Sequence, residues 1–227
     1  MSGMKFNLPI QKSLMELVYL ELKDKILKGE IESYTRLMEI SLAEKMNVSR
    51  TPIRKAIKKL ADDGLVTIEP RRGAYVSKIS VKDMVDVFEV REDLESFAAY
   101  LAAQRIKDPQ KSQLKHYVEM FESAVENNDK EKMIEFDSAF HSFIVECSDN
   151  RTLIDMVDHI QELSLRFRYL YYDDVSQYIK MPAEHRRIME AIISGDSDRA
   201  REETDAHVKA LKECIFNLEK KWNHGNR

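Results

Sequence analysis

Cysteine, glycine and proline are all scarce in this 227-residue chain, which has 2 Cys, 6 Gly and 5 Pro. Two cysteines cannot form the disulfide framework of a small secreted protein, so we expect buried thiols in a reducing compartment. Because helix-breaking residues are few, the long apolar patterns with a 3.6-residue period predict a mainly α-helical protein.

Long apolar runs are also missing. No stretch of about 18 apolar residues is present, and the first residues lack the apolar centre of a signal peptide. We therefore expect a cytoplasmic protein with no membrane contact. A glycine-rich phosphate loop and an obvious Ser/His/Asp or Cys/His arrangement are missing as well, which gives no support to the enzyme classes that depend on them.

The charge is unevenly distributed along the chain. Residues 1–78 contain 15 Lys and Arg against 10 Asp and Glu, whereas residues 79–227 contain 21 against 30. This asymmetry favours a basic module that binds a polyanion, followed by an acidic module with a different role. We predict two domains with these boundaries, and the net charge of −4 does not exclude binding to nucleic acid.

The predicted elements of residues 1–78 follow the order of a winged helix-turn-helix. Periodicity and turn residues predict helices at 11–28, 38–46 and about 50–63, then strands at 65–69 and 74–78. Asn47 tolerates the left-handed backbone of a helix stop, and Ser49 or Thr51 can cap the third helix. Pro52 then lies in the first turn, where a missing N–H costs nothing.

The third helix places apolar and basic residues on different faces. The face that we expect to be buried comprises Ile53, Ile57 and Leu60. The face that we expect to be exposed comprises Arg50, Arg54 and Lys58. A recognition helix needs this division, because arginines near its N-terminus can bind guanine edges bidentately in the major groove.

A second basic cluster lies between the two predicted strands. Arg71 and Arg72 would reach phosphates or the minor groove, and Gly73 would let the backbone approach closely. A basic helix that is merely solvated is the alternative interpretation. The ordered set of helices, the proline and the Arg-Arg-Gly hairpin together favour binding to DNA.

The run VSRTPIRKAIKKLADDGLV…PRRGAYV and the upstream RLMEISLAEKM resemble the DNA-binding domain of the GntR family of bacterial transcription regulators. The resemblance implies that Arg36, Ser49, Arg50, Thr51, Arg54 and Gly73 contact DNA, and we add Arg72 of the wing. The chain departs from the family at Ser33-Tyr34-Thr35, where a Pro-Gly turn is usual. The departure leaves the conformation of this turn open.

Residues 79–227 are predicted to form an antiparallel bundle of about six helices. Ser80–Asp83 has the sequence of a helix-capping box. The helices are expected at roughly 81–106, 110–127, 130–148, 151–171, 175–194 and 197–222, with a break at Asp108-Pro109.

Four polar residues fall on the apolar faces of these helices. They are Asp137, His141, His185 and His207. Buried carboxylates and imidazoles need partners, and one divalent cation would satisfy all four groups together. Three imidazoles and a carboxylate suit Zn or Ni, with Mn, Fe or Co as alternatives. Core histidines satisfied by hydrogen bonds or by an Asp–His ion pair are the simpler interpretation.

The motifs FDSAFH, PAEHRRIMEAIISGDSDRA and DAHV resemble the FCD domain, the effector-binding half of FadR-type GntR regulators. Many members bind one metal ion per chain through the positions occupied here by Asp137, His141, His185 and His207. The resemblance thus implies a metal site made of these four residues.

Arg91 also lies in the middle of an apolar stripe, within VREDLE. An ion pair with Glu95, one turn later, is the structural interpretation. The functional interpretation is an anchor for a small carboxylate effector, because guanidinium binds carboxylate bidentately. Family members often use an arginine here on an organic acid that also touches the metal.

Together these patterns predict a homodimeric transcription regulator, which we expect to be a repressor. It would bind a palindromic double-stranded DNA operator and change its affinity when the acid binds. Two alternatives stay open. One is a metal-dependent hydrolase or lyase fused to a DNA-binding domain, and the other is a regulator with a purely structural metal.

Overall fold

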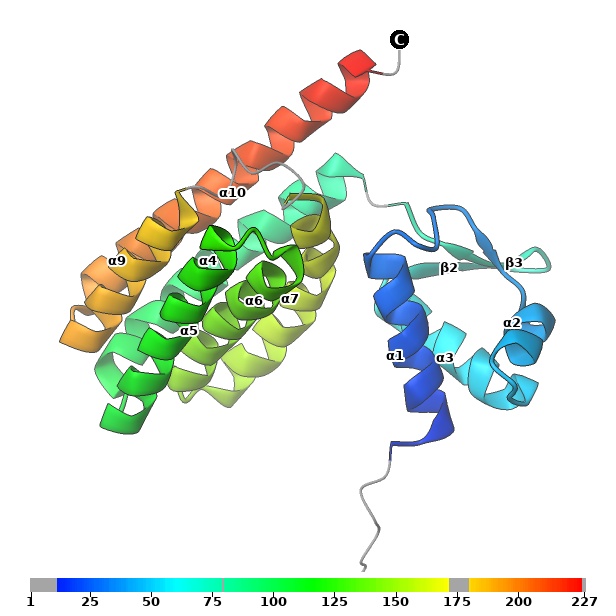
Figure 1. Cartoon of the computed structure of the whole chain (residues 1–227), viewed down its shortest axis with the longest axis horizontal. Helices are drawn as coiled ribbons and strands as arrows, with labels where there is room; N and C mark the ends of the chain where they lie inside the picture. Colours follow the sequence, from blue (N-terminus) through cyan, green and yellow to red (C-terminus); the bar gives the residue numbers. More distant parts are fainter. Residues whose placement is uncertain (1–11, 79, 172–179, 226–227) are drawn as a thin grey trace, which may run out of the picture. The chain divides into compact units, whose positions relative to one another are not determined.

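The computed structural model describes residues 12–78, 80–171 and 180–225 (Figure 1). The chain divides into two compact units, Met1–Lys78 and Ile79–Arg227. The first contains a winged helix-turn-helix and the second a bundle of helices, so the predicted fold class is confirmed.

The first unit contains three helices and a small antiparallel sheet. The helices are α1 (Leu14–Leu27), α2 (Glu39–Lys45) and α3 (Arg50–Asp62). The strands are β1 (Arg36–Leu37), β2 (Val66–Glu69) and β3 (Gly73–Val76), in the order β1-β3-β2. Helix α1 packs against α3, and a capping box between Ser13 and Glu16 begins α1.

The turn between α2 and α3 follows the prediction from sequence. Asn47 has a φ of 52°, which is the left-handed conformation that asparagine tolerates. Ser49, and not Thr51, occupies the N-cap position of α3. The chain therefore reverses within four residues and sets α3 against α2.

Strand β1 was not predicted. Tyr34 takes a φ of 67° in the turn where the family usually has Pro-Gly. Its N–H donates to the Val76 carbonyl over 2.8 Å, and the Val76 N–H donates to the Thr35 carbonyl over 3.0 Å. These bonds attach the turn to the wing, so Arg36 pairs with Tyr75 of β3.

The second unit is a helical bundle built around α4 (Figure 1). Its helices are α4 (Val81–Arg105), α5 (Asp108–Glu126), α6 (Lys130–Cys147), α7 (Arg151–Tyr171), α9 (Met181–Ser194) and α10 (Ser197–Gly225). The predicted capping box at Ser80 and Asp83 begins α4. The predicted start of the fifth helix, near 175, lies outside the described residues.

One predicted boundary was wrong. Asp108-Pro109 does not break the chain before α5, because the helix already begins at Asp108 with Pro109 in its first turn. The missing N–H of proline is harmless there.

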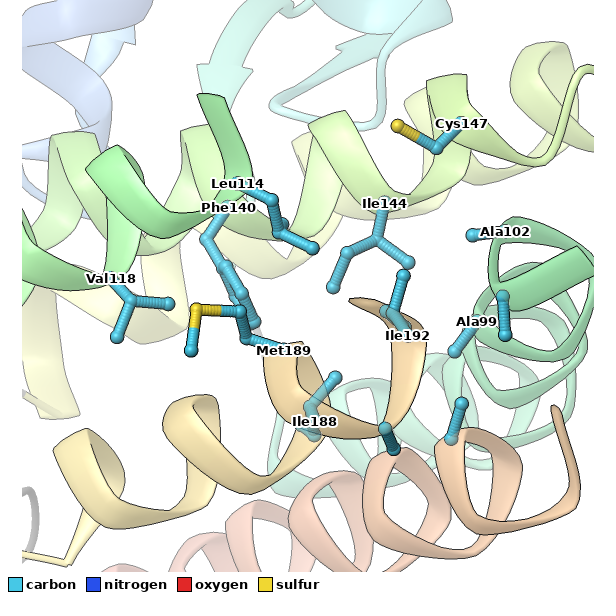
Figure 2. Close-up of a cluster of buried hydrophobic side chains, with 13 residues drawn as sticks. Ala99, Ala102, Leu114, Val118, Phe140, Ile144, Cys147, Ile188, Met189 and Ile192 are labelled. Carbon is cyan, nitrogen blue, oxygen red and sulfur yellow. The ribbon is translucent and has the colours of Figure 1, made fainter. Parts of the chain in front are cut away.

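Small side chains allow α4 to pack closely against its neighbours. Ala98, Ala99 and Ala102 are fully buried on this helix. Figure 2 shows Ala99 and Ala102 beside large apolar residues of α6 and α9. This dense apolar cluster fixes α6 and α9, which supply much of the candidate site below.

Candidate DNA-binding surface and metal centre

Helix α3 presents its basic residues to solvent, as its spacing predicts. Arg50, Arg54 and Lys58 are exposed. The opposite side is buried and comprises Ile53, Ala56, Ile57 and Leu60. The apolar side thus anchors the helix, while the basic side is available to a polyanion.

A hollow of about 350 Å³ is lined by residues of β1, α2, α3 and β3. It is lined by four of the predicted DNA-contact residues, Arg36, Arg50, Arg54 and Gly73. The other three lie outside it. Ser49 and Thr51 are exposed at the start of α3, and Arg72 pairs with Glu69 on the wing at 2.8 Å.

Gly73 allows Arg36 to lie across the wing. Its φ is 120°, and a Cβ built on it would be 3.1 Å from Nε of Arg36. A larger residue would therefore strain the backbone and displace this guanidinium. The predicted close approach at Gly73 is in the structure an approach by a protein side chain.

Glu39 also lines the hollow, although no sequence pattern pointed to it. Its carboxylate accepts hydrogen bonds from Arg50 and Arg54. Because these residues are 11 and 15 positions away on a different helix, no helical periodicity links them. Only the tertiary fold reveals this contact.

In the second unit, the four predicted metal ligands are buried and lie together. They come from α6, α9 and α10, and each is at most 2% exposed. The three histidines each offer one nitrogen within 4.8 Å of the others. Oδ1 of Asp137 lies 3.6 Å from Nε2 of His141 and 3.4 Å from Nε2 of His185.

Two glutamates hold the outer nitrogens of this cluster. Nδ1 of His207 lies 2.8 Å from Glu184 Oε2, and Nδ1 of His141 lies 3.2 Å from Glu95 Oε2. A carboxylate at Nδ1 favours the tautomer with its proton there, which leaves the Nε2 lone pair facing inward. Neither glutamate was predicted to have this role.

The inner nitrogens of the cluster lack hydrogen bonds within the part of the chain described. Nε2 of His141, His185 and His207 is buried without such a partner. Buried polar atoms of this kind are costly unless something binds them. The donor set and its orphaned nitrogens therefore fit a divalent transition metal ion.

The electrostatics keep two of the imidazoles neutral. Burial lowers the pKa of His185 to about 4 and also lowers the pKa of His207. Burial opposes charge on His141 too, but Asp137 and Glu95 outweigh it and raise the pKa of His141. Metals bind the neutral imidazole, so His185 and His207 are already in the binding form at neutral pH.

Aromatic rings fix the position of His185. The Phe140 ring stacks on the His185 ring with 4.5 Å between the ring centroids, and the centroid of the Phe121 ring lies 4.7 Å from that of His185. Phe140 belongs to the apolar cluster in Figure 2. The imidazole is thereby held by packing, since no hydrogen bond to either of its nitrogens is found among the described residues.

Arg91 is buried, only 1% exposed, and pairs with Glu95. Its Nε donates to Oε1 over 2.7 Å, and its Nη2 donates to Oε2 over 3.2 Å. Burial would raise the pKa of Glu95, but Arg91 and His141 outweigh it and hold that pKa far below its usual range. Glu95 thus connects Arg91 directly to the histidine cluster.

Within the residues described, no helix combines the length and the apolar character that crossing a bilayer requires.

The family comparisons match both units. Residues 14–76 match the bacterial regulatory proteins, gntR family, and residues 86–210 match the FCD domain. The HTH-type transcriptional repressor RspR of Escherichia coli K12 is 29% identical over 198 residues, 87% of each chain. The regulator YdhC of Bacillus subtilis 168 is 30% identical over 190 residues, 83% of this chain and 85% of the relative.

Solved structures support the fold. E. coli McbR/YncC has a TM-score of 0.77 at 20% identity and covers 93% of this chain and 100% of its own. A GntR regulator from Rhodococcus sp. RHA1 has a TM-score of 0.75 at 19% identity, covering 91% and 99%.

The relatives are named as transcription regulators, so the prediction of a DNA-binding regulator rather than an enzyme is confirmed. The chain belongs to the GntR family of bacterial transcription regulators and carries an FCD domain.

Proposed function

We propose that this regulator changes its affinity for an operator when a small organic acid binds at a metal centre in the helical unit. The observation that carries the proposal is the convergence of Asp137 with His141, His185 and His207, whose inner nitrogens lack partners in the described chain. These residues would hold one divalent ion per chain, Zn or Ni in preference to Mn, Fe or Co.

A bound ion would supply a Lewis-acidic position for one oxygen of the acid. Arg91 would bind the carboxylate of the acid. Its guanidinium has five N–H donors, and the pair with Glu95 uses Nε and Nη2. An incoming acid would compete with Glu95 for this arginine and so disturb the bond between Glu95 and His141.

The regulator would act as a homodimer on a palindromic operator, because a two-fold protein reads a two-fold site. The helical unit offers a surface for this pairing. Val90 and Phe97 of α4 and Met156 of α7 are 46%, 39% and 51% exposed, and α4 packs against α7. Since RspR is named a repressor, we propose the same direction of control here.

Metal content of purified protein tests the site directly. Protein purified without chelator or a nickel column is analysed for metals beside a His141→Ala, His185→Ala variant. We expect about one transition metal ion per chain in the native protein and none in the variant. Absence of metal from both, with no thermal shift on adding divalent ions, would rule out the proposed centre.

A regulator with a purely structural metal is the remaining alternative, and it predicts that operator binding by the native protein does not respond to any organic acid. Where a response is seen, Arg91→Lys tests the role of Arg91 in it. Lysine keeps the charge beside Glu95 but loses the bidentate fork. We expect the variant to retain metal and operator binding while its response to organic acids weakens. An unchanged response would remove Arg91 from the effector site.

A further inference from the structure

The Glu39 carboxylate accepts hydrogen bonds from two arginines of the recognition helix α3. Nε of Arg54 donates to Oε1 over 3.0 Å and to Oε2 over 3.2 Å, and Nη2 of Arg54 donates to Oε2 over 2.9 Å. Nη2 of Arg50 donates to the same Oε2 over 3.3 Å. One carboxylate thus holds both arginines that are expected to read bases.

The contact occupies only one edge of the Arg54 guanidinium. Glu39 takes the edge formed by Nε and Nη2, which leaves the edge formed by Nη1 and Nη2. One edge is enough for the bidentate contact with O6 and N7 of guanine. The Arg54 side chain as a whole is 67% exposed, so the pair with Glu39 does not bury it.

The carboxylate stays charged in this position. Hydrogen bonds from Arg54 and then Arg50 outweigh the effect of burial and lower the pKa of Glu39. Its own side chain is 28% exposed and lines the same hollow as the two arginines. A DNA strand in that hollow would therefore meet a fixed negative charge between two positive ones.

We propose that Glu39 is a positioning residue that determines the sequence specificity of the DNA-binding surface. It has two effects. The first is to hold the Arg54 guanidinium in one orientation, so that less freedom is lost when a guanine is bound. The second effect is electrostatic. The Glu39 carboxylate repels a phosphate that occupies the place of a base edge, and this weakens binding to DNA that lacks the operator sequence.

The test uses the full-length protein, an operator fragment selected from random DNA with the wild-type chain, and a random duplex of equal length. Fluorescence anisotropy measures both affinities at several salt concentrations. For Glu39→Gln we expect tighter binding to the random duplex and a roughly tenfold smaller ratio of operator to random affinity, the scale of one bidentate base contact. Reselection should show weaker guanine preference at one position per half-site.

Two further variants separate positioning from charge. Glu21→Gln on α1 removes the same charge outside the hollow. Its ratio of operator affinity to random-duplex affinity should stay within about twofold of the wild-type ratio, because distant surface charges are screened. Glu39→Asp keeps the charge but shortens the side chain, so it should keep weak random binding and lose guanine preference.

Equal tightening on both duplexes by Glu39→Gln would mean that only net charge matters and would overturn the proposal. An unaltered guanine preference in Glu39→Asp would overturn the positioning role. Glu39 belongs to the DNA-binding unit, so none of these outcomes depends on whether the helical unit binds a metal.

Discussion

An arginine–glutamate pair lies at the candidate site of each unit, and the two pairs differ in their exposure to water. Nη2 of Arg54 lies 2.9 Å from Oε2 of Glu39, and the two side chains are 67% and 28% exposed. Arg91 and Glu95 are 2.7 Å apart with side chains 1% and 2% exposed. The chemistry is the same, but water and salt screen only the first pair.

This difference decides what each arginine can do. An exposed pair remains open to further partners, so Arg54 can bind DNA with its second edge while Glu39 holds the first. A buried pair cannot separate without leaving an uncompensated charge. Arg91 can therefore accept a new partner only if that partner is itself an anion, which is a requirement that an organic acid meets.

The largest effect should come from breaking the buried pair. Glu95→Ala leaves the Arg91 charge unpaired, and we expect the helical unit to lose about 3–5 kcal/mol of unfolding free energy. Urea unfolding of metal-free protein, followed by circular dichroism, measures the change.

The matched control replaces both charges, as Arg91→Met with Glu95→Leu. Because an apolar pair removes the buried charge, the double variant should recover most of the lost stability. A double variant as unstable as Glu95→Ala would show that packing or the lost contact between Glu95 and His141, and not the unpaired Arg91 charge, causes the loss.

Metal addition should produce the next largest effect. Zn²⁺ at about 100 times its dissociation constant should raise the unfolding free energy by about 2.7 kcal/mol, because the ion binds only the folded cluster. The His141→Ala, His185→Ala variant should show no such gain in the same urea titration. An equal gain in both proteins would place the ion elsewhere.

Replacing the exposed arginine should affect DNA binding while leaving the fold intact. Arg54→Lys loses the planar fork, so operator binding should weaken by about 1–3 kcal/mol in an anisotropy titration. Lys58→Ala is the comparison, since loss of a phosphate contact should weaken all sequences alike and reduce the salt slope by about 1. Loss of discrimination in Lys58→Ala but not in Arg54→Lys would reverse these roles.

The smallest effect on stability should come from breaking the exposed pair. Glu39→Gln should shift the urea midpoint of the first unit far less than Glu95→Ala shifts that of the second, because the pair is solvated in both states. A comparable loss would contradict the contrast between the two pairs.

Most of the fold could be predicted from sequence because its signals are local. The capping box at Ser80, the left-handed turn at Asn47 and the two faces of α3 depend only on neighbouring residues. Strand β1 could not be found this way. It has two residues, and it exists because Tyr34 takes a positive φ and bonds to the distant Val76.

In the candidate sites, too, sequence predicts what depends on neighbouring residues and misses contacts between separate helices. Periodicity alone placed His185 and His207 on buried faces, and the structure brings them together. The glutamates that hold other side chains were missed in these roles because each bond joins separate helices. Glu184 on α9 contacts His207 on α10, and Glu39 on α2 contacts Arg54 on α3. Sequence spacing carries no information about such pairs.

The length of α4 has a mechanical consequence. This helix of 25 residues begins three positions after the DNA-binding unit ends, and Arg91 lies ten residues along it. At 1.5 Å per residue, the segment from Val81 to Arg91 is a rod of about 15 Å. A tilt of about 10° around Arg91 would move Val81 by about 2.6 Å, estimated from that length. The helix would thus act as a lever, converting an adjustment at a buried arginine into a displacement where the linker to the DNA-binding unit begins.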